Sequence, residues 1–167
     1  MGTVITRKNF LHAATFTGSG LLLAPYLSRA KEFQQEKPLA LQPELVKEFV
    51  IAGHGNLEKV KQMLAQQPAL LNACWDWGGG DFETAIEGAG HTGSKDCANY
   101  LLANGARMNV FCGAMLGKLD FVKALLTAFP NLKESRGPHG LQLIHHATKG
   151  GDNAKDVLVY LQLINAK

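Results

Sequence analysis

The chain has few of the residues and motifs that most catalytic or disulfide-rich proteins depend on. It has only three cysteines, Cys74, Cys97 and Cys112, and no Cys-x-x-Cys pair, so one thiol is left over in any pairing scheme. We expect Cys97 and Cys112 to act as small apolar residues on helices. Formation of one disulfide between two of the three cysteines remains an alternative. The glycine run at residues 78–80 is not followed by Lys-Ser/Thr, which excludes a phosphate-binding P-loop. No serine or cysteine lies in a nucleophile motif.

An excess of charge of one sign is also missing once the N-terminus is set apart. Residues 1–30 contain Arg7, Lys8 and Arg29 and no acidic residue, so the rest of the chain has 14 basic and 14 acidic residues. This balance excludes the basic surface that nucleic acid or an anionic membrane would require. We expect neither to be a partner of the mature chain.

The N-terminal segment has no apolar run long enough for a membrane span, which needs about 20 strongly apolar residues. Its basic start, uncharged middle and small residues at Ser28 and Ala30 are typical of an export signal that is cleaved after Ala30. The start resembles a twin-arginine signal, with Lys8 in place of the second arginine. The signal positions are Arg7, Lys8, Phe10 and Leu11.

The sequence therefore predicts an export signal over residues 1–30, a linker over 31–42 and a periplasmic domain over 43–167. The export route, by the twin-arginine or the general secretory pathway, stays open. An uncut anchor and an N-terminal helix that is no signal also remain as alternatives.

A Gly-anchored pattern, with polar residues followed by apolar residues at helical spacing, occurs four times after the linker. The glycines are Gly55, Gly93, Gly117 and Gly151, and their mean spacing is 32 residues. Such self-similarity indicates stacked helical units, because one unit cannot bury its apolar face alone. A generic bundle of antiparallel helices is the alternative.

These units resemble ankyrin repeats. Residues 84–89 and 142–147 stand where that family has its Thr-Pro-Leu-His-x-Ala box, and residues 100–109 are similar to its Leu-Leu-Leu-x-x-Gly-Ala-x-x-Asn close. The resemblance implies an all-α solenoid of about four helix-turn-helix repeats with short β-hairpin-like fingers. The repeats are expected at about 43–73, 74–107, 108–133 and 134–163.

Three departures from the family pattern carry structural predictions. The first repeat has no Thr-Pro-Leu-His box and is expected to act as a cap, with Pro43 starting its first helix. The second has a long finger at residues 75–82, which places one tryptophan toward the core and one in solvent. The third has no room for a finger, so residues 110–116 must form its first helix.

Acidic and histidine side chains offer two possible chemical sites. Glu83, Glu87 and His91 are spaced four apart, which would place them on one face of a helix. They could form an acid–base group, although a solvated face or a partner contact is the preferred interpretation. The second group is His139, His145 and His146, of which the last two are adjacent and diverge too far to chelate one ion. We expect His54 to serve the turn before Gly55 and His145 to form a structural hydrogen bond.

The resemblance to ankyrin arrays implies a monomeric, non-catalytic protein-interaction module without a cofactor or metal, whose partner is another protein. Ankyrin arrays bind through their finger tips and the first helix of each repeat, and aromatic residues are frequent at such interfaces. The alternatives are a small periplasmic metal-binding protein or enzyme that uses the two groups above, and a cytoplasmic interaction module with an uncleaved N-terminus. The expected partner-binding residues are Trp75, Asp76, Trp77, Asp81, Phe82, Glu87, His91, Arg136, His139 and His146.

Overall fold

The computed structural model describes residues 38–166 of the chain. The expected export signal, its cleavage position Ala30 and most of the linker lie outside the described residues. Within residues 38–166, no helix is long and apolar enough to cross a membrane.

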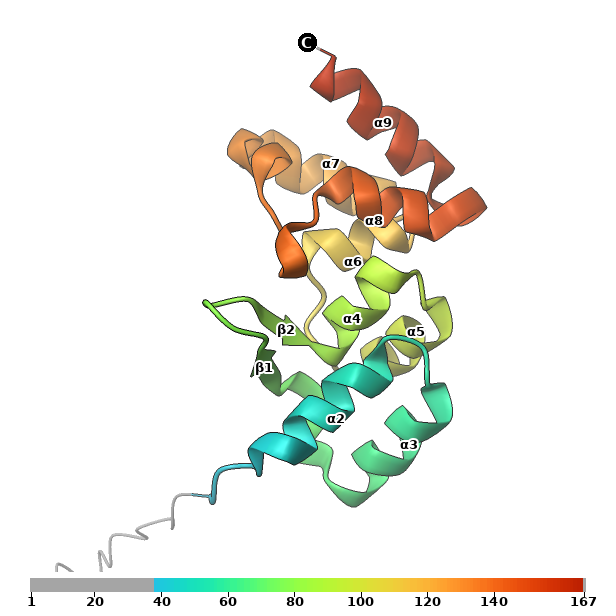
Figure 1. Ribbon diagram of the computed structural model, residues 1–167. Helices are drawn as coiled ribbons and strands as arrows, with labels where there is room; N and C mark the ends of the chain where they lie inside the picture. The colour runs from blue at the N-terminus through green and yellow to red at the C-terminus, as the bar shows by residue number, and fades with distance from the viewer. Residues whose placement is uncertain (1–37, 167) are drawn as a thin grey trace, which may run out of the picture. The chain divides into compact units, whose positions relative to one another are not determined.

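The described chain is mostly helical, as the sequence predicts, with one two-stranded sheet (Figure 1). Short 3₁₀ helices connect several of the α-helices. In chain order the elements are α2 (Pro43–Gly53), α3 (Leu57–Gln66), η2 (Pro68–Asn72), β1 (Cys74–Asp76), β2 (Phe82–Thr84), α4 (Ala85–Thr92), α5 (Lys95–Ala103), α6 (Val110–Met115), α7 (Leu119–Ala128), η3 (Pro130–Glu134), η4 (Pro138–Gly140), α8 (Leu143–Gly150), η5 (Gly151–Ala154) and α9 (Lys155–Asn165).

The helices begin and end at residues that suit those positions. Pro43 opens α2, where its missing N–H costs nothing. Thr84 and Glu87 form a capping box at the start of α4, in which the Glu87 carboxylate accepts from the Thr84 amide at 2.8 Å. Gly93 and Gly105 end α4 and α5 with positive φ angles, a conformation that favours glycine. The chain therefore turns sharply after each of these two helices.

The helices α2, α4, α6 and α8 pack against one another in that order (Figure 1). Small residues permit close approach: the Gly53 backbone meets the Ala85 backbone, and Gly150 meets Met115. Ala89, Ala114 and Ala147 are fully buried along the same stack. In a second row α3 contacts α5, and α7 contacts α9.

The buried apolar side chains form two clusters. The first is centred on α2 to α5 and includes Phe49, Leu70 and Leu101, and the second lies among α6 to α9 and includes Val122 and Leu161. Cys97 and Cys112 are buried in the first cluster, as expected, while Cys74 is exposed, and all three thiols are free.

The strands β1 and β2 pair in antiparallel register and, with the loop between them, form a long finger (residues 74–84), which the sequence predicts at residues 75–82. Trp75 packs against the first apolar cluster, whereas Trp77 is exposed, so one tryptophan faces the core and one faces solvent, as predicted. The two differ because Trp77 lies beyond the end of β1, since residues two apart within a strand share a face. No such finger precedes α6, which begins directly after Asn109. Asn109 caps this helix by accepting from the Cys112 amide at 2.8 Å.

Candidate metal centre

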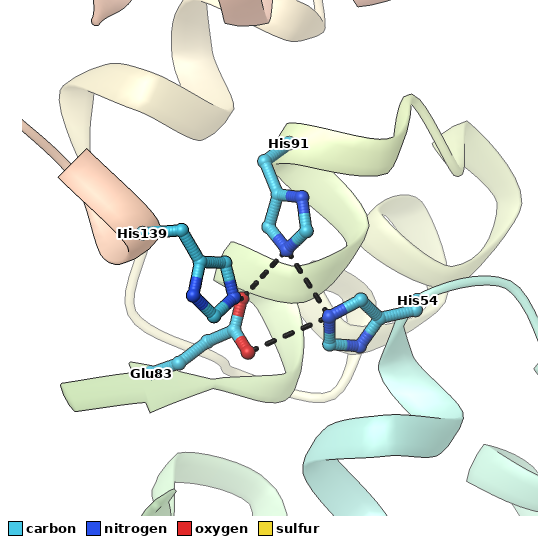
Figure 2. Close-up of side chains that lie close together, drawn as sticks. All are labelled: His54, Glu83, His91 and His139. Carbon is cyan, nitrogen blue, oxygen red and sulfur yellow. Dashed lines mark hydrogen bonds and ion pairs between the residues drawn. The ribbon is translucent and has the colours of Figure 1, made fainter. Parts of the chain in front are cut away.

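Four side chains from distant parts of the chain meet between the finger and the ends of α2 and α4 (Figure 2). They are His54, Glu83, His91 and His139, and one ligand atom from each lies within 4.8 Å of the others. The Nε2 of His91 is 2.8 Å from Oε1 of Glu83 and 3.1 Å from Nε2 of His54. Nε2 of His139 is 3.6 Å from Oε1, and Nε2 of His54 is 3.5 Å from Oε2. The three imidazoles thus surround a single carboxylate.

Each of the four residues stands at a structurally fixed position. His54 is the C-cap of α2 and His91 lies in the last turn of α4, so the packing of these two helices brings the two rings together. Glu83 is the middle residue of β2, where the strand alternation turns it inward while Phe82 is exposed. The pairing of β1 with β2 fixes the position of Glu83 along the finger, because Glu83 is paired with Trp75.

His139 reaches the cluster from a turn of η4 that lies beside the finger. Its φ angle is 58°, and it is the one non-glycine residue with positive φ among residues 38–166. Asp81 holds it there twice, because Oδ1 accepts from the His139 amide and Oδ2 lies against the His139 Nδ1, at 2.8 and 2.9 Å. The backbone amide of His139 in the first place, and also its ring, hold the pKa of the Asp81 carboxyl below its usual value. Asp81 is therefore ionised and acts as an acceptor.

Partners outside the cluster decide which ring nitrogens face the centre as acceptors. Nδ1 of His54 is 3.0 Å from the Val50 carbonyl, which can only accept, so this nitrogen carries the proton. Nδ1 of His139 carries a proton for the same reason, since it donates to the ionised Asp81. In the neutral rings Nε2 of His54 and Nε2 of His139 then present lone pairs to the centre of the cluster.

Glu83 is a fully buried carboxylate with one oxygen left over. Trp77 donates its indole N–H to Oε2 at 2.7 Å, while Oε1 has no hydrogen-bond partner. His91 lies 2.8 Å from Oε1, but the pair lacks hydrogen-bond geometry. Burial alone would raise the pKa of the Glu83 carboxyl, and the contacts of His91 and Trp77 together with nearby His54 hold it below its usual value. Glu83 is therefore ionised in its buried position.

This arrangement is suited to a cation. Three acceptors converge, namely two imidazole nitrogens and Oε1, while His91 can donate at most one proton from Nε2. A tetrahedral zinc ion with bonds of about 2.0–2.1 Å separates its ligand atoms by about 3.3 Å. Among Oε1 and the three Nε2 atoms, the separations of 2.8, 3.1 and 3.6 Å lie around that value, and the whole set of ligand atoms lies within 4.8 Å. The donor set of three imidazoles and one carboxylate also matches what zinc and neighbouring transition metals accept.

The structure gathers several of the expected partner-binding residues around this centre. His91 and His139 are part of it, and Trp77 and Asp81 hold its members from outside. Phe82 is exposed beside it on the finger, and Arg136 is exposed on the loop that precedes His139. Asp76 is exposed on the finger, where it accepts from the Gly78 amide, and Trp75 is half-buried.

Three interpretations drawn from the sequence need correction. Glu83 is not on a solvated face, because it lies on β2 with its side chain fully buried. Glu87 is not in the cluster, since its oxygens are occupied by Thr84 and by the Asn109 side chain at 2.7 Å. His146 is not available to a partner, because it is buried with Nδ1 on the Gln142 carbonyl. Burial lowers its pKa to about 4, so it stays neutral.

The group of His139, His145 and His146 does not form. Nε2 of His145 is 3.0 Å from the His91 carbonyl, which makes His145 the structural hydrogen-bonding residue that the sequence predicts. Sequence patterns did not identify His54 as a cluster member, because its place before Gly55 indicates only a turn. A signal is nevertheless present in the sequence. His54 and His91 stand one and two residues before the glycines that anchor successive pattern copies, and equivalent positions of stacked units are neighbours.

No family model matches the chain, and no curated protein matches it either.

Proposed function

We propose that this protein binds a divalent transition-metal ion, of which Zn²⁺ is the best fit, through His54, Glu83, His91 and His139. The observation that supports this most strongly is the buried, ionised Glu83, whose unpartnered Oε1 faces three imidazoles. An isolated buried carboxylate is costly, and a metal ion compensates it better than one shared proton.

The residues around the ligands favour the same conclusion. Metal-bound histidines commonly donate their other ring N–H to a carbonyl or a carboxylate, which fixes the tautomer and the direction of the ring. His54 does so to the Val50 carbonyl and His139 to Asp81, and Trp77 orients Glu83 in the same way. This proposal departs from the expectation of a metal-free chain, which treats His54 as a turn residue and Glu83 as a surface residue.

Metal titration of the purified protein, stripped with a chelator, tests the proposal. We expect one Zn²⁺ per chain by calorimetry, with affinity lowered more than about 100-fold in His91→Ala and His139→Ala, because loss of an outer partner alone costs about 10–100-fold. His145→Gln is the matched control, since it replaces a histidine outside the cluster with a side chain that can still donate to the His91 carbonyl, and it should leave the affinity unchanged. Circular dichroism verifies that each variant is folded. Wild-type protein that binds no Zn²⁺, or variants that bind it normally, would contradict the proposal.

We further propose that the stack is of the ankyrin type and that the chain is exported to the periplasm. The ordered packing of α2, α4, α6 and α8, the Thr84 capping box and the glycine ends of the helices support the first proposal. The basic start and the small residues before position 31 support the second. Mature protein that begins at Lys31 in a periplasmic extract is the expected result, and an intact Met1 in the cytosol would contradict export.

A non-catalytic protein-interaction module remains the second candidate, because the finger exposes large aromatic surface. Phe82 is 59% exposed and Trp77 37% exposed, and aromatic residues of this kind frequently anchor interfaces. Phe82→Ala should abolish capture of a partner protein from periplasmic extract, with Phe129→Ala as the control for exposed aromatic surface away from the finger. Equal capture by both variants and by the wild type would show that the finger is not the contact.

A further inference from the structure

The four residues of the centre are not equally shielded from solvent. The side chains of Glu83 and His91 are 0% and 13% exposed, whereas those of His54 and His139 are 27% and 34% exposed. In Figure 2, His54 and His139 lie on opposite sides of the Glu83 carboxylate. The solvent side of the centre is therefore the side between these two rings.

Trp77 borders the same side. Its ring centroid is 6.5 Å from that of His54 and 5.9 Å from that of His139. The indole is held by its hydrogen bond to Glu83 and remains partly exposed. The Trp77 ring thus lies beside the solvent side of the centre and leaves His54 and His139 partly exposed.

The charge of the centre favours an anion at this side. A divalent ion bound by one carboxylate and three neutral imidazoles keeps a charge of +1 in its inner shell. The charge of Asp81 is already engaged by the amide and the ring of His139. Arg136 adds a positive group on the same loop, because it donates from Nη1 to the carbonyl of Gly140, the residue after His139.

We propose that the metal ion has one exchangeable fifth coordination position between His54 and His139, beside Trp77, and that a small anionic oxygen ligand such as a carboxylate fills it. The inference rests on the proposed metal-binding function. The four side chains already fill a tetrahedral shell, so the exchangeable position is a fifth one, and zinc can expand its coordination to five ligands. The ligand class is set by the net positive charge of the inner shell.

Cobalt substitution tests this inference, because the visible absorption of Co²⁺ changes when its coordination number changes. Co²⁺-loaded protein is titrated with acetate and, separately, with azide. We expect a saturable shift of the d–d bands and a lower absorptivity, as a position is filled. His54→Ala supplies the positive control, since removal of one ligand must open a position to either anion.

The outcomes separate the two proposals. Bound Co²⁺ whose spectrum ignores both anions in the wild type, but responds in His54→Ala, overturns the exchangeable position and leaves the metal site intact. Failure of the wild-type protein to bind Co²⁺ and Zn²⁺ overturns both proposals. A spectrum that saturates with acetate in the wild type supports both.

Discussion

Two of the clustered histidines use their two ring nitrogens for different purposes. His54 and His139 donate outward with Nδ1 and face the centre with Nε2. In each case the outer partner, a backbone carbonyl or a carboxylate, selects the tautomer that leaves an inward lone pair. At the scale of single residues, the geometry of the cluster therefore depends on its outer partners as well as on the four clustered side chains.

Replacement of Asp81 by asparagine tests this dependence. The amide no longer favours the inward lone pair of His139, and we expect Asp81→Asn to weaken Zn²⁺ binding about 10–100-fold. Asp76→Asn makes the same change in the same finger, where the carboxylate only accepts from the Gly78 amide. Calorimetric titration of both variants is the measurement, and equal affinities would contradict the role of Asp81.

His146 makes a separate prediction at the residue scale, on stability. Its pKa is lowered to about 4 by burial, with smaller contributions from His145 and His91, whereas the unfolded chain has a value near 6.5. The unfolded state therefore binds a proton first as the pH falls. The free energy of unfolding should decrease between about pH 6.5 and pH 4, by up to about 3 kcal/mol, and show no contribution from His146 above that window.

Urea unfolding at pH 7 and pH 4.5, with a chelator present to remove any metal contribution, measures this loss. His146→Gln should unfold with a smaller difference between the two pH values, because glutamine does not titrate. An equally large difference in the variant would assign the pH dependence to other groups.

At the scale of elements, the close approach of α2 and α4 is what brings His54 to His91. A Cβ atom on Gly53 would meet the backbone of Ala85, while a Cβ on Gly55 would meet no atom. We expect Gly53→Ala to lower the free energy of unfolding by about 1–3 kcal/mol and also to weaken Zn²⁺ binding, because the helices must move apart. Gly55→Ala, the control, should change neither by a comparable amount. Urea unfolding and calorimetry on both variants test the prediction.

The sequence was a good guide to these elements. Glycine punctuation, the start at Pro43, the absent finger before α6 and the long finger at residues 74–84 all follow from local chemistry that acts over a few residues. The prediction that Glu83 shares a helix face with Glu87 and His91 is wrong, because Glu83 lies on strand β2 and the helix α4 begins only at Ala85. The strand of the finger turns the Glu83 side chain inward, and helical spacing cannot predict the direction of a side chain on a strand.

The site as a whole could not be predicted, because it depends on contacts between distant segments. His139 is brought to Asp81 across 58 positions, and His91 to His54 across 37. Sequence patterns indicate that His91 and His139 are noteworthy but place them on a partner-binding surface. Only the stacking of the helices, together with the turn of η4, shows that they face the same carboxylate.

At the scale of the whole molecule, the centre links segments from the two apolar clusters. His54, Glu83 and His91 belong to elements packed on the first cluster, and His139 precedes α8, which packs in the second. An ion bound to the folded state alone stabilises it by about 4 kcal/mol when its concentration is about 1,000 times the dissociation constant. Metal binding would therefore raise the free energy of unfolding of the whole helix stack and not only stabilise the finger.

Anomalous X-ray diffraction from crystals of the Zn²⁺-loaded protein, measured at the zinc absorption edge, tests the central claim most directly. We predict one anomalous peak about 2.0–2.2 Å from Nε2 of His54, His91 and His139 and from a carboxylate oxygen of Glu83. A zinc peak bound elsewhere on the chain, or no peak between these four side chains, would contradict the account.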